Sequence, residues 1–433
     1  MKQPIGNYRW TICALIFFAT TINYLDRQVI SLVVDDYLNP EFHWTETDYA
    51  NITVAFQFFY AIAMFFAGRL IDKLGTKMGY ALSLVLWSVA AMGHALIRST
   101  TGFFVARAAL GVTESGNFPA AIKTVAEWFP KKERALATGI FNSGANIGAI
   151  IAPLTVPVIA DHWGWRAAFF ITGAVGLIWL IFWFILYEIP KKQKRLSSSE
   201  FEYIHSDAEE KQVASEEPVT KIGWGQILKF KQAWAFILGK FLTDGIWWFY
   251  LFWLPKFLKA GFGLTKQELS LPIALVYTIA AFGSIFGGWL PLLFIKKGSP
   301  VFKARKTSML IYAFCALTVI SAQLMGEQGM WYAILIIGIA AAAHQAWSAN
   351  IFTTVSDMFP KSAVGSVTGI GGMAGGLGGI AIAKSAGFLF DYYKGLGHIQ
   401  TGYQIMFIIC GLSYLFAWLV MHLLVPKMQP IKL

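Results

Sequence analysis

The sequence predicts an all-α integral membrane protein with twelve transmembrane helices arranged as two six-helix bundles. Three observations predict this class. Of the 433 residues, 56% are hydrophobic and only 14% are charged, a balance that soluble domains of this length do not have. The apolar residues gather into runs of about 20, the length at which a helix spans the hydrocarbon core. The longest polar interval, residues 188–231, separates six of these runs from the other six.

Each apolar run justifies one helix, in chain order. The twelve expected spans are 8–34, 48–70, 77–96, 101–125, 134–159, 165–187, 232–259, 267–295, 306–324, 329–355, 364–393 and 402–424. Their grouping predicts an N-terminal six-helix bundle over 1–187, a cytoplasmic linker over 188–231 and a C-terminal six-helix bundle over 232–433. The linker is rich in Ser, Glu and Lys, which is typical of a solvated segment.

The charge distribution predicts the orientation in the membrane. The net charge is +11, but the basic residues are scattered among short loops instead of forming one nucleic-acid-binding face. Most of them fall in loops on the side of the N-terminus, whereas the first loop on the other side, DDYLNPEFHWTETD, has no Lys or Arg. The positive-inside rule therefore predicts that both termini are cytoplasmic.

No metal or cofactor is expected. Cys13, Cys315 and Cys410 all lie within apolar spans, so they indicate neither a disulfide framework nor a Cys-based metal site. The stretch GGMAGGLGG lies inside a span and matches neither nucleotide-binding glycine pattern.

Four charged residues within the first and fourth spans are the main site candidates. Asp26 and Arg27 are adjacent, and Arg107 and Glu114 lie seven residues apart, about 10 Å along one helix face. A charge at mid-span costs about 3 kcal/mol on insertion, so these groups must face protein, water or each other. Two interpretations stay open: a structural network of ion pairs, or a site where a carboxylate exchanges its Arg partner for a proton.

Other polar residues within the spans are candidates for contacts with a hydroxylated ligand. On the first, second and fifth helices these are Tyr24, Gln57, Tyr60, Asn142 and Asn146. In the seventh span Lys240, Asp244 and Trp247 share a face, either as a self-neutralising pair or at a ligand, and Trp248 belongs to the same aromatic run. The tenth span contributes His344, Gln345 and Ser348, whereas Lys384 in the eleventh has no assigned role.

Two matching segments indicate an internal repeat. GRLIDKLGTK, residues 68–77, follows the second span, and GGWLPLLFIKKG, residues 287–298, follows the eighth. The first copy resembles the cytoplasmic gating motif of the major facilitator superfamily through Gly68, Asp72, Lys73, Gly75 and Lys77. The second copy has Leu292 where that motif carries its acid, which puts a gating salt bridge there in doubt.

Four further motifs resemble the anion:cation symporter family of this superfamily: NYLDR, RAALGVTESGNFPA, EWFPKKERALATG and AHQAWSANIFTTVSDMFP. Its bacterial members take up sugar acids with protons, and the second half of the chain is most similar to hexuronate transporters. The resemblance implies the major facilitator fold and a bacterial cytoplasmic (inner) membrane. It also implies that Asp26 and Glu114 carry protons, that Arg27 and Arg107 hold the substrate carboxylate, and that Tyr24 and Tyr60 line the pocket.

The expected function is proton-coupled import of a hexuronate, galacturonate or glucuronate, by alternating access. The expected partners are this anion, protons and the lipid bilayer, with the protein acting as a monomer. An aldonate such as galactonate, or glucarate, is the alternative substrate, and efflux or exchange stays open. A membrane enzyme or sensor is less favoured, because no HExxH, paired-Cys or GxSxG pattern and no long soluble domain is present.

Glycines at four-residue spacing let helix backbones approach closely, and we expect them to permit the movement of the two halves during transport. They are Gly144 and Gly148, Gly283 and Gly287, and Gly371, Gly375 and Gly379. Their helices are expected to form the seam between the two halves.

Overall fold

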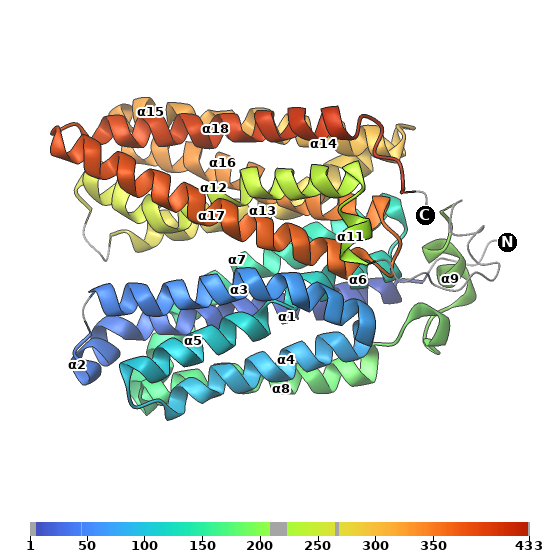
Figure 1. Cartoon of the computed structure of the whole chain (residues 1–433), viewed down its shortest axis with the longest axis horizontal. Coiled ribbons are helices and arrows are strands. Elements are labelled where there is room, and N and C mark those ends of the chain that lie inside the picture. Colours follow the sequence, from blue (N-terminus) through green and yellow to red (C-terminus); the bar gives the residue numbers. More distant parts are fainter. Residues whose placement is uncertain (1–5, 45, 208–222, 265–267, 432–433) are drawn as a thin grey trace.

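A computed structural model describes residues 6–44, 46–207, 223–264 and 268–431. Figure 1 shows long, nearly parallel helices in two layers, with the blue-to-green first half on one side and the yellow-to-red second half on the other. Both termini lie at the same end of the molecule as the short helices α9 and α11. We call this the linker end, and the opposite end, which holds α2 and α15, the far end.

The helices of the first half are α1 (Tyr8–Val33), α2 (Asn39–Phe42), α3 (Glu46–Leu74), α4 (Thr76–Gly93), α5 (Thr100–Glu114), α6 (Asn117–Trp128), α7 (Lys131–Trp163) and α8 (Trp165–Leu186). Those of the connecting segment are α9 (Ser198–Ile204) and α11 (Trp224–Ile227). The second half comprises α12 (Lys231–Phe262), α13 (Ser270–Lys296), α14 (Val301–Ala316), α15 (Ala322–Gln328), α16 (Met330–Met358), α17 (Val364–Gly395) and α18 (Ile399–Leu424).

These helices match the predicted spans with two differences. The fourth span is divided into α5 and α6 by a turn at Ser115 and Gly116, because Pro119 has no N–H to donate to the carbonyl of Ser115. The ninth span continues from α14 through a 3-10 turn, Leu317–Ser321, into α15.

Nine described helical segments are long and apolar enough to cross a membrane. The other three predicted spans coincide with α1, with α5 and α6 together, and with α12, which carry the charged candidates.

One helix-ending unit occurs in both halves. Helix α6 ends before Phe129 and α16 ends before Phe359, and both Phe residues are extended and followed by proline. Each donates its N–H to a carbonyl four residues earlier, Val125 or Val355. A residue before proline disfavours the helical conformation, so the Phe-Pro pair ends one helix and sets the direction of the next.

The seam between the halves is made by α3 against α17 and by α7 against α13, and at several points glycine backbone lies directly against backbone of the other half. A Cβ on Gly68 would lie 2.0 Å from the carbonyl oxygen of Gly365, and one on Gly139 would lie 2.3 Å from that of Ser284. No side chain fits at these points without moving a helix.

The glycine pairs singled out in the sequence serve a different purpose. Gly144 packs against the Phe17 carbonyl of α1, Gly283 against Ala342 of α16, and Gly375 against Asp244 of α12. These contacts lie within one half each. The prediction that α7, α13 and α17 line the seam is therefore correct, but other glycines of the same helices make it.

Helix α9 is tied to the start of α1. The carboxylate of Glu200 accepts hydrogen bonds from the backbone N–H groups of Tyr8 and Arg9, at 3.0 Å each, and from the Arg9 side chain. These are first-turn donors that the helix itself cannot satisfy. Arg9 also pairs with Glu133 at 2.8 Å, so α9, α1 and α7 are joined at the linker end.

Candidate functional site

An ion pair between α1 and α5 forms the centre of the candidate site. Arg27 donates from Nε and Nη2 to Glu114 Oε2, at 3.1 and 2.9 Å. The Arg27 side chain is 12% exposed and that of Glu114 is fully buried. The second carboxylate oxygen of Glu114, Oε1, has no hydrogen-bond partner within the described part of the chain.

Aromatic rings surround the Arg27 guanidinium. Its central carbon lies 4.5 Å from the ring centroid of Tyr24 and 4.9 Å from those of Phe56 and Tyr60. Each ring face attracts a cation. Phe56 was missed in the sequence, although it lies four residues before Tyr60 and therefore on the same face of α3.

Arg107 lies beside this pair. Its Nη2 donates to the backbone carbonyl of Arg27 at 3.2 Å, and its guanidinium carbon is 4.9 Å from the Phe56 ring centroid. Its Nε and Nη1 are buried and have no hydrogen-bond partner among the described residues. Arg107 and Glu114 share a helix, as predicted, but Glu114 pairs with Arg27.

Asp26 is separate from these contacts although it is adjacent to Arg27. It is 1% exposed, and neither carboxylate oxygen has a hydrogen-bond partner within residues 6–44, 46–207, 223–264 and 268–431. A buried carboxylate without a partner is costly as an anion and is tolerated far more easily with a proton bound.

The second half contributes a buried charge pair and a ring stack. Lys240 Nζ lies 2.5 Å from Asp244 Oδ2 and 3.9 Å from the Phe352 ring centroid. The predicted i, i+4 pair is therefore formed. Trp247 stacks on His344, and His344 Nδ1 is hydrogen-bonded to the Tyr414 hydroxyl at 2.6 Å. Neither Phe352 nor Tyr414 was predicted.

Gln345 joins the two halves near this site. Asn142 Nδ2 donates to Gln345 Oε1 at 2.8 Å, and Gln345 Nε2 lies 3.5 Å from Asn146 Oδ1. Asn142 also donates to Ser284 of α13 at 3.1 Å. These amides thus lie at the seam itself, between α7 and α16.

The remaining candidates divide between the interior and the surface. Ser348 is buried one turn after His344, and Trp248 packs against Gly379 of α17. Gln57 is half-buried, whereas Lys384 is exposed. The described residues contain no group of three His, Cys, Asp or Glu side chains that would hold a metal ion.

The gating motif connects α3 to the start of α17 at the linker end. Asp72 pairs with Lys123 at 2.9 Å. It also accepts from the backbone N–H groups of Gly365 and Ser366, at 3.2 and 2.7 Å, and from the Ser366 hydroxyl. An acid at a helix N-terminus satisfies free amides and complements the helix dipole.

The rest of the motif shapes the turn between α3 and α4. Gly75 has φ +78°, a conformation that favours glycine, and it precedes α4 directly. Lys77 pairs with Glu188 at 2.8 Å, and this contact lowers the pKa of the Glu188 carboxyl. Lys73 is exposed.

A second charge cluster closes the linker end between α7, α14 and α16. Asp357 lies 2.7 Å from Arg305 Nε and 3.8 Å from Arg134 Nη1. Arg305 also donates to the Lys131 carbonyl at 3.1 Å, so the cluster joins the two halves. Leu292, which occupies the acid position of the repeated motif, is not part of this cluster. The acid of the cluster in the second half is Asp357.

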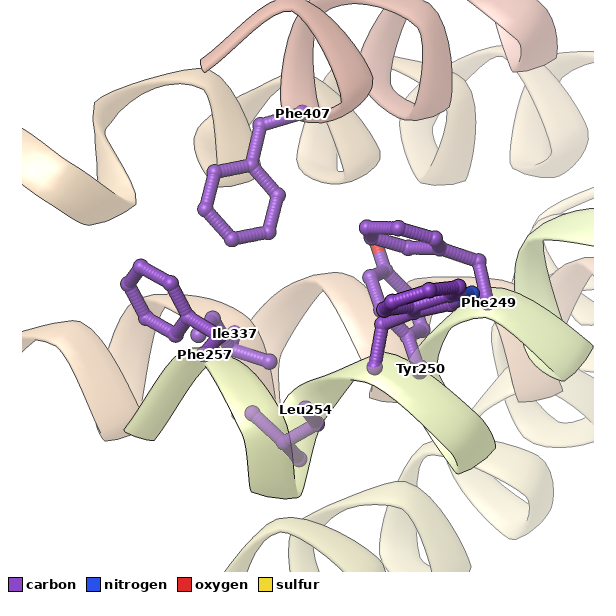
Figure 2. A pocket seen from close by; sticks show the side chains of 7 residues that line it. Phe249, Tyr250, Leu254, Phe257, Ile337 and Phe407 are labelled. Carbon is purple, nitrogen blue, oxygen red and sulfur yellow. The ribbon is translucent and has the colours of Figure 1, made fainter. Parts of the chain in front are cut away.

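A narrow apolar void in the second half is not part of this site. Figure 2 shows its lining, in which rings from α12 and α18 point toward one another. The lining residues are Phe249, Tyr250, Trp253, Leu254, Phe257, Ile337 and Phe407. No charged group lies among them, so the void has nothing that would attract an anion.

Long apolar helices around a buried charged centre, with two halves meeting on bare backbone, define a multi-pass membrane transporter. The sequence model described as Major Facilitator Superfamily matches residues 16–383. The chain belongs to this superfamily.

Among curated proteins, the chain is similar to transporters of sugar acids. It is 35% identical to the hexuronate transporter of Escherichia coli K12 over 90% of this chain and 89% of that one. It is 37% identical to the galacturonate transporter of Dickeya chrysanthemi over 67% and 84%. It is 29% identical to the D-galactonate transporter of Escherichia coli O6:H1 over 90% of both.

Among solved structures, the proton:xylose symporter XylE, bound to 6-bromo-6-deoxy-D-glucose, superposes with a TM-score of 0.78 at 16% identity. The match covers 98% of this chain and 97% of that one. At this identity the likeness establishes the fold alone, which agrees with the predicted major facilitator fold.

Proposed function

We propose that the chain imports a hexuronate, galacturonate or glucuronate, together with protons by alternating access. The observation that carries this proposal is the buried ion pair of Arg27 and Glu114 inside a ring of aromatic side chains. The similarity to a hexuronate and a galacturonate transporter supports the substrate class.

The coupling step is an exchange of partners at Arg27. When Glu114 takes up a proton, its ion pair with the guanidinium is lost, and the planar fork of Arg27 then donates two hydrogen bonds to the substrate carboxylate. Arg107 supplies additional buried donors beside it. Asp26, which is buried without a hydrogen-bond partner among the described residues, is the second proton carrier.

The hydroxyls of the sugar ring form hydrogen bonds with uncharged polar side chains and with a buried ion pair. Asn146, Gln345, His344 and Ser348 offer donors and acceptors, and Lys240 and Asp244 form an ion pair in the second half. Tyr24, Tyr60 and Trp248 provide flat surfaces for the apolar face of a sugar. The hydrogen bond from Asn142 of the first half to Gln345 of the second supports a site shared between the halves.

Alternating access follows from opening and closing at the two ends. The clusters of Asp72 and Asp357 hold the linker end closed, so we assign this conformation to the state that is accessible from the far end. We also propose that the linker end is cytoplasmic, that the bilayer is a bacterial inner membrane, that the chain acts as a monomer, and that the halves divide at 188–231.

The test is uptake of labelled galacturonate and glucuronate into proteoliposomes, with an inward proton gradient imposed and then collapsed by an ionophore. We expect accumulation that disappears with the gradient. Arg27→Gln should abolish it, and Lys384→Gln, a change at an exposed cation, should not. If neither uronate accumulates in a preparation that binds other sugar acids, the hexuronate assignment is wrong.

One specific observation favours a second substrate. The chain is similar to a D-galactonate transporter over 90% of its length, so an aldonate is the alternative. Galactonate should then compete with galacturonate for uptake, and stronger accumulation of galactonate itself would replace the hexuronate by the aldonate.

A further inference from the structure

A groove on the outer surface of the first half lies away from the site described above. It has a volume of about 530 Å³ and lies between α3, α4 and α5. Several of its side chains are apolar and exposed, so it faces the hydrocarbon of the membrane. The apolar part of its lining includes Phe59, Ile62 and Phe66 of α3 and Leu82 and Leu86 of α4.

The groove changes from apolar to basic along α3. Phe59, Ile62 and Phe66 follow helical spacing on one face, and Arg69 and Lys73 continue that face toward the linker end. Among the described residues that line the groove there are two cations and no acid. An apolar channel that ends in two cations complements a lipid with an anionic head group, because it matches both the acyl chain and the charge of such a molecule.

Trp224 of α11 supplies an independent indication. Its ring lies 4.3 Å from the Phe65 ring centroid and it lines the groove. Its indole N–H is buried and has no hydrogen-bond partner among the described residues. Tryptophan is enriched at membrane interfaces, where the ring is buried and its N–H meets a polar head group.

We propose that this groove binds an anionic phospholipid of the leaflet at the linker end. Its phosphate contacts Arg69 and Lys73 and accepts the Trp224 N–H, while an acyl chain lies along Phe66, Ile62 and Phe59. The lipid thereby joins α11 to α3. Helix α3 carries Gly68 and Asp72 of the seam on its other face, so an occupied groove holds the linker end in its closed arrangement.

The test measures lipid retention by native mass spectrometry of the full chain, released from nanodiscs that contain equal amounts of POPG and POPC. We expect the wild type to retain POPG preferentially. Each Lys or Arg near a membrane surface is worth about a fivefold change in binding, so Arg69→Gln with Lys73→Gln should weaken POPG retention about 25-fold.

A matched control uses the corresponding repeat position in the second half. Lys296→Gln with Lys297→Gln removes two exposed cations from the end of α13, at the same end of the molecule, and should leave retention unchanged. Trp224→Phe keeps the ring but removes the N–H, and Leu86→Trp fills the groove without changing its charge. Both should reduce POPG retention.

Three results would overturn the proposal: equal retention in the two double variants, no preference of the wild type for POPG over POPC, or no effect of Leu86→Trp. A final arm adds inorganic phosphate to protein that has retained POPG. If phosphate alone displaces POPG at millimolar concentration, the groove holds a free anion and the lipid assignment is wrong. None of these measurements depends on the transported substrate.

Discussion

Arg27 is held by two kinds of contact that respond differently to a proton. Glu114 holds it by charge, and this contact weakens when the carboxylate is neutralised. The rings of Tyr24, Phe56 and Tyr60 hold it by cation–π attraction, worth about 0.5–2 kcal/mol each, which does not depend on Glu114. The guanidinium therefore stays oriented when its acidic partner is protonated.

Arg27→Lys tests the importance of the planar fork. An ammonium keeps the charge but makes no bidentate contact and stacks less well on aromatic rings. Losing one such contact, worth about 1.5–3 kcal/mol, should raise the apparent KM for the substrate at least about tenfold. The measurement is initial uptake against substrate concentration. Lys384→Arg is the control, and an unchanged KM in Arg27→Lys would contradict a fork-shaped contact.

Glu114→Gln tests the proton exchange. Gln has nearly the same size but cannot take up a proton, so Arg27 remains available to the anion at every pH. We expect substrate binding and counterflow to persist, and accumulation driven by the proton gradient to be lost. Glu327→Gln, at an exposed acid of α15, should behave as the wild type. Coupled uptake that continues in Glu114→Gln would remove Glu114 from the mechanism.

Helices carry two sets of glycines with separate roles. One set, including Gly144 and Gly283, joins helices inside a half. The other set, including Gly68, Gly139 and Gly369, lies where the halves meet, mostly against main-chain atoms. Gly144 and Gly283 each have another glycine four residues later, whereas Gly68 and Gly139 have none four residues away, so a search for four-residue glycine spacing finds the first set and misses these seam positions.

A pair of variants on α17 separates seam packing from helix propensity. Gly369→Ala puts a Cβ 2.3 Å from the Met64 carbonyl, whereas Gly387→Ala puts one in open space on the same helix. Both substitutions replace Gly by Ala within a helix, which favours the helical conformation by about 1 kcal/mol. Only Gly369→Ala should open the linker end, measured as a longer distance between spin labels on α3 and α17. If the two variants gave the same distance between the labels, the close packing at Gly369 would not be what keeps the linker end closed.

At the scale of the whole molecule, the closed linker end depends on Asp72. Asp72→Asn removes the salt bridge to Lys123 and weakens the cap on α17. Hydrogen bonds to a charged group are worth about 1.5–3 kcal/mol, so exchange of the Gly365 and Ser366 amides should accelerate roughly tenfold or more. Hydrogen–deuterium exchange measures this, with the exposed Asp391→Asn as control. Unchanged exchange would show that other contacts keep this end closed.

Most of the fold is predictable from the sequence, because the length of each apolar run and the distribution of Lys and Arg among the loops are local properties of the chain. The sequence also contains the identity of the buried charges, since Arg27 and Glu114 stand out wherever they lie within a span. Pairing is a different matter. That Glu114 meets Arg27 instead of Arg107, or that Gln345 meets Asn142, depends on the rotation of whole helices. The break at Pro119 was readable, and was missed because the apolar run continues through it.

The bare-backbone seam has a thermal consequence. When the linker end opens at Gly68, Gly139 and Gly369, the surface exposed there is mainly peptide and little of it is hydrocarbon. Apolar exposure raises heat capacity and polar exposure lowers it by a smaller amount per unit area, so opening these contacts should change the heat capacity little and in the negative direction. The opening equilibrium should then follow a straight van't Hoff line, and the protein would alternate between its two states with nearly the same enthalpy change in cold and warm surroundings.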